Sequence, residues 1–226
     1  MNEKSSANDD PNQSLVISFL TLRRAVGILG IFLPIGLVIG VPLLSECKQV
    51  QDSISDYFYT RMNSFMVGTL CAVSLFLFCY KGYEKRDTVA SKLACIFALG
   101  VAFFPTGGPS TSSICNYLHR NSPSWVSTVH DISASLFFLT LAYFCLFLFV
   151  KTSGQPTKRK KERNVVYKIC GYAILFCIVF LLLYFKVDAI QSALKDYKPV
   201  FVLETVALWA FGISWLTKGE FILGDK

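Results

Sequence analysis

Residues 129–150 form a long, mainly apolar run with a histidine and an aspartate near its start. The run reads VHDISASLFFLTLAYFCLFLFV. A helix of about 20 apolar residues is long enough to cross the hydrocarbon core of a bilayer, so this run predicts a membrane-spanning helix. His130 and Asp131 put two polar groups at the edge of a segment that otherwise suits lipid. We therefore expect a membrane protein with polar chemistry near one end of its spans.

Five further segments have the same apolar character, and the composition agrees with them. The chain of 226 residues is 53% hydrophobic and only 16% charged, whereas a soluble domain carries about a quarter charged residues. We predict an all-α bundle of six transmembrane helices in one domain, residues 25–217. The expected spans are residues 25–44, 62–80, 89–104, 129–150, 165–185 and 199–216. Residues 1–24 are polar and are expected to form a disordered tail, and residues 218–226 a short cytoplasmic tail.

Lys and Arg are distributed unevenly between the two ends of the expected bundle. If the spans alternate in direction, 16 of the 22 basic residues fall on the side of both termini and six on the other side. Basic residues in short connections mark the cytoplasmic side of a membrane protein. Both termini are therefore expected in the cytoplasm. The same topology accounts for the net charge of +7, and we expect no nucleic-acid partner.

Two of the eight cysteines lie in polar connections on the side away from the termini. These are Cys47 and Cys115. The other six lie within or at the ends of apolar runs, where cysteine behaves as a small hydrophobic residue. An oxidising compartment would permit a disulfide between Cys47 and Cys115. The alternative is a pair of unpaired thiols.

A GxxxG spacing occurs in the first expected span, at Gly36 and Gly40. Two small residues at this spacing allow another helix to approach closely. A homo-oligomer that pairs through these glycines is one arrangement that the spacing permits.

Ionisable residues from three spans are expected at one depth near the outer surface. Glu204 lies about 7 Å inside the last span at a rise of 1.5 Å per residue. Ionisable groups within a span are costly and usually face a partner inside the bundle. We expect His130 to be that partner for Glu204, with Arg61 as the alternative. The candidate cluster for ligand or proton binding is Asp56, Arg61, His130, Asp131 and Glu204.

The role of this cluster has several interpretations. It could bind a proton or a head group, or it could simply join the spans. His130 and Asp131 point about 100° apart on a helix, so Asp131 has the alternative role of stabilising the helix start. We expect no bound metal and no cofactor, because the chain has only two His and zinc sites normally use more His or Cys at recognisable spacings.

Three short motifs resemble those of a group of uncharacterised bacterial six-span membrane proteins. They are ISD at residues 54–56, FFPT at 103–106 and VHDISA at 129–134. That group is similar, more distantly, to the Frag/DRAM/Sfk membrane proteins of eukaryotes, which are associated with lipid-anchor remodelling and autophagy. The resemblance covers about residues 25–217. It implies a six-span protein of the bacterial inner membrane, and it favours lipid handling.

Three functions are compatible with these features. The first is a protein that binds or moves membrane lipid, or a small amphiphile, through an outer-leaflet polar pocket. The alternative is a membrane-embedded lipid hydrolase that uses the same His, Asp and Glu residues, although the sequence lacks a G-x-S-x-G nucleophile motif. The second alternative is a small proton-coupled transporter with Glu204 as the proton carrier. The sequence does not decide whether the protein is an enzyme.

Overall fold

The computed structural model describes residues 11–82, 84–108, 115–118, 123–152 and 154–224. These residues form helices and connecting loops, with no strand among them. The α-helices are α1 (Pro11–Leu44), α2 (Asn63–Cys79), α3 (Lys85–Phe103), α4 (Ser124–Tyr143), α5 (Lys158–Lys186), α6 (Asp188–Leu194) and α7 (Pro199–Lys218). The shorter elements are the 3₁₀ helices η1 (Ser55–Tyr59) and η3 (Lys195–Tyr197) and a π-helical turn, η2 (Phe144–Leu148), which continues α4.

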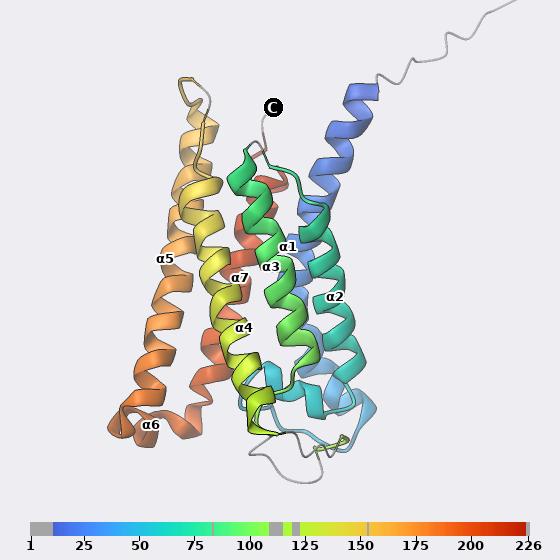
Figure 1. Ribbon diagram of the computed structural model, residues 1–226, viewed down its shortest axis with the longest axis vertical. Coiled ribbons are helices and arrows are strands. Elements are labelled where there is room, and N and C mark those ends of the chain that lie inside the picture. Colours follow the sequence, from blue (N-terminus) through green and yellow to red (C-terminus); the bar gives the residue numbers. More distant parts are fainter. Residues whose placement is uncertain (1–10, 83, 109–114, 119–122, 153, 225–226) are drawn as a thin grey trace, which may run out of the picture.

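The six long helices form a closed ring in chain order. Each of α1 to α4 packs against the next helix, α5 packs against α7, and α7 returns to α1. The α2–α3 and α4–α5 connections lie at the same end of the bundle as the C-terminus, whereas the α1–α2 connection and α6 lie at the opposite end (Figure 1). We call these the upper end and the lower end.

Among the described residues, four helical segments are long and apolar enough to cross a membrane. They are Phe19–Leu44, Ser124–Leu148, Lys158–Lys186 and Pro199–Lys218. Large hydrophobic side chains also project from the outside of the ring and are more than half exposed, including Phe32, Leu75, Ile96, Phe147 and Phe176. An apolar surface of this extent suits lipid rather than water. The structure is thus an α-helical bundle with four helices of membrane length.

The expected N-terminal tail is wrong in part, because α1 already begins at Pro11. Residues 11–24 are helical, and residues 1–10 lie outside the described part of the chain. α5 likewise begins at Lys158, seven residues before the expected span, and the Thr157 hydroxyl caps it by accepting the N–H of Lys160 at 3.1 Å. Lys and Arg are good helix formers, so the charged residues mark the end of the apolar part and not the end of the helix.

The GxxxG glycines of α1 face α2 of the same chain. A Cβ atom on Gly36 would lie 2.6 Å from the ring of Phe65, and one on Gly40 would overlap the side chain of Met62. The two glycines therefore make room for side chains of α2 and of Met62, the residue that directly precedes it. A homo-oligomer through Gly36 and Gly40 stays a prediction.

An aromatic cluster fills the upper half of the bundle. Trp215 of α7 is fully buried. Its ring centroid lies 5.1 Å from that of Tyr80, 5.4 Å from Phe149, 5.7 Å from Phe144 and 5.9 Å from Phe211. Aromatic pairs at such separations stabilise a core beyond the area that they bury, so this cluster joins α7 to α4 and to the end of α2.

The α1–α2 connection folds back into the lower end of the ring. Its residues 51–60 are buried apart from the partly exposed Asp52; we call them the plug segment. The predicted disulfide is present just before it, between Cys47 and Cys115, with the Cα atoms 4.9 Å apart. At its other end, the carbonyl of Tyr59 accepts the N–H groups of Tyr117 and Leu118 at 2.7 and 3.0 Å. The plug segment is thus fastened to the α3–α4 connection.

Candidate functional site

His130 lies about two turns into α4, and both of its ring nitrogens have partners. Nδ1 lies 2.6 Å from the carbonyl oxygen of Phe104, and Nε2 lies 3.0 Å from Oγ of Ser55. A carbonyl only accepts hydrogen bonds, so Nδ1 carries a hydrogen. In the neutral imidazole, Nε2 is then the acceptor for the Ser55 hydroxyl. His130 therefore joins the end of α3 to the plug segment.

Asp56 is a buried carboxyl group of η1. Its Oδ1 accepts the hydroxyl of Thr106 at 3.1 Å, and its backbone N–H donates to Oγ of Ser53 at 3.0 Å. Burial raises the pKa of the Asp56 carboxyl above its usual range; the hydrogen bonds from Ser53 and Thr106 oppose this effect, and the carboxylate of Asp52 adds to it. Asp56 is consequently easier to protonate than an exposed aspartate.

Glu204 lies just over one turn into α7 and reaches the plug segment. Its Oε2 accepts the backbone N–H of Ile54 at 2.6 Å. Close by, the N–H of Phe201 donates to the carbonyl of Asp52 at 2.9 Å. The predicted pairing of Glu204 with His130 or Arg61 is therefore wrong: the carboxylate holds a backbone group, and the His130 nitrogens are already bonded to Phe104 and Ser55.

Arg61 lies apart from the other predicted site residues. Its guanidinium stacks over the ring of Tyr117, 4.5 Å from the centroid, and the residue is exposed. It does not line the cavity that the other four share. The predicted depth near the lower end is correct, but the side chain points away from the interior of the ring, so Arg61 does not belong to the site.

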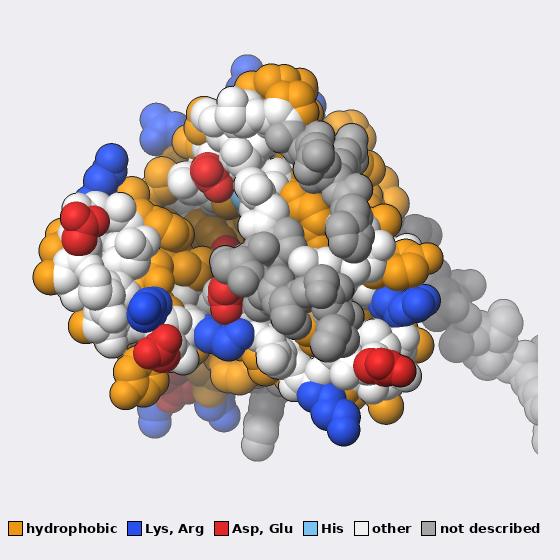
Figure 2. All heavy atoms as spheres, turned by 90° about the horizontal axis from the view of Figure 1, so that it is seen from below, with side chains coloured by type: hydrophobic (Ala, Val, Ile, Leu, Met, Phe, Trp, Pro, Cys, Tyr) orange, Lys and Arg blue, Asp and Glu red, His pale blue; other side chains and the backbone are white. Residues whose placement is uncertain are grey.

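A cavity of about 1410 Å³ opens at the lower end of the bundle. Its wall combines the plug segment with parts of α4, α5, α6 and α7. Figure 2 shows this end hollowed, with hydrophobic side chains lining the hollow. Four of the five predicted ligand-binding residues line it: Asp56, His130, Asp131 and Glu204.

The cavity is lined by a polar group and an apolar group of side chains, which we call its polar side and its apolar side. The polar side holds the four carboxyl and imidazole residues named above together with Ser53 and Ser55. The apolar side is formed by Phe138 of α4 and a stripe on α5, Ile178, Leu181, Leu182 and Phe185. A space with one polar side and one apolar side matches a molecule that is itself amphiphilic.

Sequence reasoning missed an ion pair at the mouth of the cavity. Nζ of Lys198 lies 3.0 Å from Oδ1 of Asp52 and also donates to the carbonyl of Val50. Lys198 has a left-handed backbone, with φ of 51°, and directly precedes α7. No sequence pattern around Lys198 indicates that it pairs with Asp52, which lies 146 residues earlier in the chain.

No metal site is found in the described part of the chain, where no three His, Cys, Asp or Glu side chains gather to hold an ion. Comparisons with protein-family models, with curated proteins and with solved structures find no match for this chain.

Proposed function

We propose that this protein is a six-span membrane protein that binds a lipid or a small amphiphile in the lower cavity. The observation that carries the proposal is the cavity itself. Its lining combines a polar cluster from the plug segment, α4 and α7 with an apolar stripe of α5. A head group would lie against Asp56, Asp131 and Glu204, and a hydrocarbon tail along Leu181 and Leu182.

The distribution of charge and the disulfide support one orientation in the membrane. The α2–α3 and α4–α5 connections at the upper end are rich in Lys and Arg, as cytoplasmic connections are. The Cys47–Cys115 disulfide lies at the lower end, and disulfides persist outside the reducing cytoplasm. The cavity would thus open toward the outer leaflet, with α2 and α3 as the two remaining spans.

The polar side favours a head group that donates hydrogen bonds. The carboxyl groups of Asp56, Asp131 and Glu204 can accept them. The basic residues of the lining, Lys186, Lys195 and Lys198, lie between the end of α5 and the start of α7. Hydroxyl or amine groups would suit the carboxyl side better than a quaternary ammonium, which has no N–H to donate.

A thermal-shift series tests this choice. Purified protein is mixed with amphiphiles of one tail length that carry a glycerol, an ethanolamine or a choline head group. We expect the first two to raise the melting temperature more than the third. Equal shifts for all three head groups, or none, would contradict the proposal.

A second candidate function is acyl-ester hydrolysis, because Ser55 and His130 are arranged as a nucleophile and its base. The Ser55 hydroxyl donates to Nε2 of His130 at 3.0 Å, and the Phe104 carbonyl orients the ring. Both residues line the cavity. Ser55 Oγ would attack the ester carbonyl while His130 takes its proton and passes it to the leaving alcohol; water would then release the acid.

Covalent labelling separates the two functions. A fluorophosphonate probe should label Ser55 of the wild-type protein and leave the Ser55→Ala variant unlabelled if the pair is catalytic. Absence of labelling in the wild-type protein, together with retained amphiphile binding, would leave binding as the function.

A further inference from the structure

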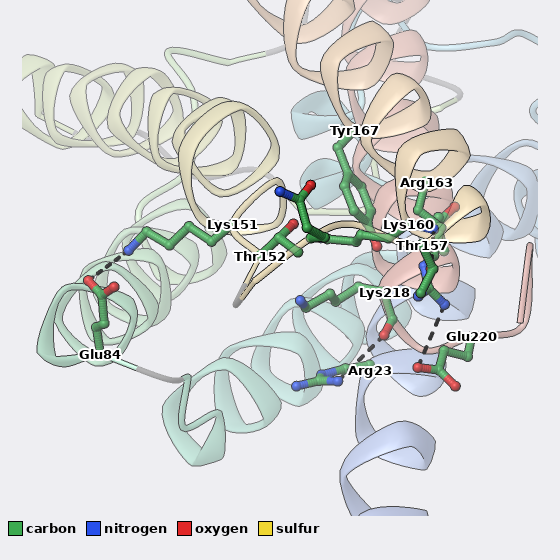
Figure 3. Close-up of a pocket in the computed structure, with 12 residues that line it drawn as sticks. Arg23, Glu84, Lys151, Thr152, Thr157, Lys160, Arg163, Tyr167, Lys218 and Glu220 are labelled. Carbon is green, nitrogen blue, oxygen red and sulfur yellow. Dashed lines mark hydrogen bonds and ion pairs between the residues drawn. The ribbon is translucent and has the colours of Figure 1, made fainter. Parts of the chain in front are cut away.

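We propose that the upper end of the bundle holds a second binding site, which takes a phosphate group. A pocket of about 630 Å³ opens there, and Figure 3 shows that its side chains come from α1, α5, α7 and the connections around them. Five of the lining residues are basic: Arg23, Lys151, Lys160, Arg163 and Lys218. Two are acidic, Glu84 and Glu220, which leaves a formal excess of three positive charges.

The two carboxylates are each engaged by one cation. Oε2 of Glu84 lies 2.8 Å from Nζ of Lys151, and Oε1 of Glu220 lies 3.8 Å from a guanidinium nitrogen of Arg163. The buried Asp87 lies 4.0 Å from the same lysine. The carboxylates therefore lie nearest to Lys151 and Arg163, and Asp87 also attracts the charge of Lys218. The other three cations of the lining are Arg23, Lys160 and Lys218.

Those three cations are held in place by aromatic rings and backbone carbonyls. The charged groups of Arg23, Lys160 and Lys218 lie 5.4 to 5.6 Å from the ring centroids of Tyr80, Tyr167 and Phe149. Two of these rings, Tyr80 and Phe149, pack directly on Trp215. In addition, Nζ of Lys160 donates to the carbonyl of Phe149 at 2.7 Å. The rigid aromatic cluster thus pre-positions the cations.

Like charges at this density are unfavourable without a counter-ion. Arg23, Lys160 and Arg163 all lie close enough to repel the charge of Lys218, and the carboxylate of Asp87 offsets part of this repulsion. Arg163 is only 8% exposed. Lysines that only set topology can stay solvated, as the exposed Lys158 and Lys161 of the same helix do. A bound anion would offset the repulsion.

The chemistry of the pocket favours a phosphate group over a carboxylate. Several cations around one small space suit a group with two negative charges and three or four oxygens. Thr157, the N-cap of α5, also lines the pocket, so the positive end of a 29-residue helix adds to the potential. The phosphate could belong to a lipid head group of the adjacent leaflet or to a soluble molecule.

A binding experiment distinguishes these sources. Inorganic phosphate and pyrophosphate are titrated against detergent-purified protein, and nanodiscs of phosphatidylcholine with or without phosphatidic acid are compared by melting temperature. Stabilisation by the soluble anions would identify a soluble ligand. Stabilisation by phosphatidic acid alone would identify a lipid. Stabilisation by neither would overturn the proposal.

Paired variants test the location. Lys160→Gln and Lys218→Gln should weaken binding at least about tenfold, since a charged hydrogen bond is lost. Lys161→Gln removes the same charge from an exposed neighbour and should bind as the wild-type protein does, and Lys160→Arg should retain binding. Lys160→Gln that binds as tightly as the wild-type protein would contradict the site. A loss of affinity in Lys161→Gln as large as that in Lys160→Gln would also contradict it.

Discussion

The backbone N–H of Ile54 donates a 2.6 Å hydrogen bond to the carboxylate of Glu204, a residue 150 positions later in the chain. This bond joins the plug segment to α7 and closes one side of the lower cavity. A carboxylate in an apolar helix is costly to bury, and here it accepts a backbone group that would otherwise lack an acceptor in the interior.

Replacing Glu204 tests the structural part of this role. Glu204→Gln keeps an oxygen that can accept the Ile54 N–H, so its melting temperature should stay near that of the wild-type protein. Glu204→Leu leaves that N–H buried without an acceptor and should cost roughly 1–3 kcal/mol. Thermal unfolding in detergent measures both. Equal stability of the leucine variant and the wild-type protein would contradict the assigned bond.

The disulfide provides a second prediction. Cys47 and Cys115 are separated by 68 residues, and closing a loop of that length is worth up to about 4 kcal/mol. Cys47→Ser, Cys115→Ser and the double variant should therefore lose the same amount of stability. Cys79→Ser removes an exposed free thiol of α2 and should change little. Additive losses in the double variant would show that the two sulfurs are not bonded.

Gly212 of α7 is expected to be intolerant of even a methyl group. A Cβ at this position would lie 2.8 Å from the carbonyl oxygen of Gly27 and 2.6 Å from Ile31, so Gly212→Ala should separate α1 from α7 and cost roughly 1–3 kcal/mol. At Gly68 of α2, an added Cβ would have nothing within 4 Å of it. Gly68→Ala should therefore be neutral or stabilising by up to about 1 kcal/mol. A melting temperature that falls equally in Gly212→Ala and Gly68→Ala would contradict this packing.

Asp56 should make stability depend on pH. Because burial raises its pKa in the folded protein above the ordinary value of 3.8, the folded state binds the proton more tightly than the unfolded state does. The contribution of Asp56 to stability is thus full below pH 3.8 and is lost as the pH rises through the folded pKa.

Asp56→Asn removes this titration while keeping an oxygen for Thr106. We expect the melting temperature of the variant, relative to the wild-type protein, to increase as the pH rises above 3.8 and then to level off. A parallel set of melting curves at several pH values measures the difference. A difference that is constant with pH, or that falls as pH rises, would contradict a raised pKa.

The helices were largely predictable because their apolar segments are long. The expected second span, residues 62–80, corresponds to α2 at Asn63–Cys79, and the last, residues 199–216, to α7 at Pro199–Lys218. The beginnings of α1 and α5 were missed because a hydropathy pattern marks the lipid-facing part of a helix and not its capped end. The short α6 carries no apolar run to reveal it.

The depth of the site residues along the helices was predictable from the sequence, but the direction of their side chains was not. Counting residues from the end of each span placed Asp56, His130, Asp131 and Glu204 at one level, and they do line one cavity. The same count included Arg61, which faces Tyr117 instead. Depth follows from the rise per residue, whereas the direction of a side chain depends on the order of helices in the ring, which no local pattern specifies.

Native mass spectrometry of the purified protein tests the central claim most directly. The wild-type protein should carry a lipid or amphiphile adduct. Leu181→Trp fills the apolar side of the cavity and should lose that adduct, whereas Leu183→Trp, on the exposed side of the same helix, should keep it. A wild-type protein without any adduct, or an adduct that is equally retained in both variants, would contradict amphiphile binding in the lower cavity.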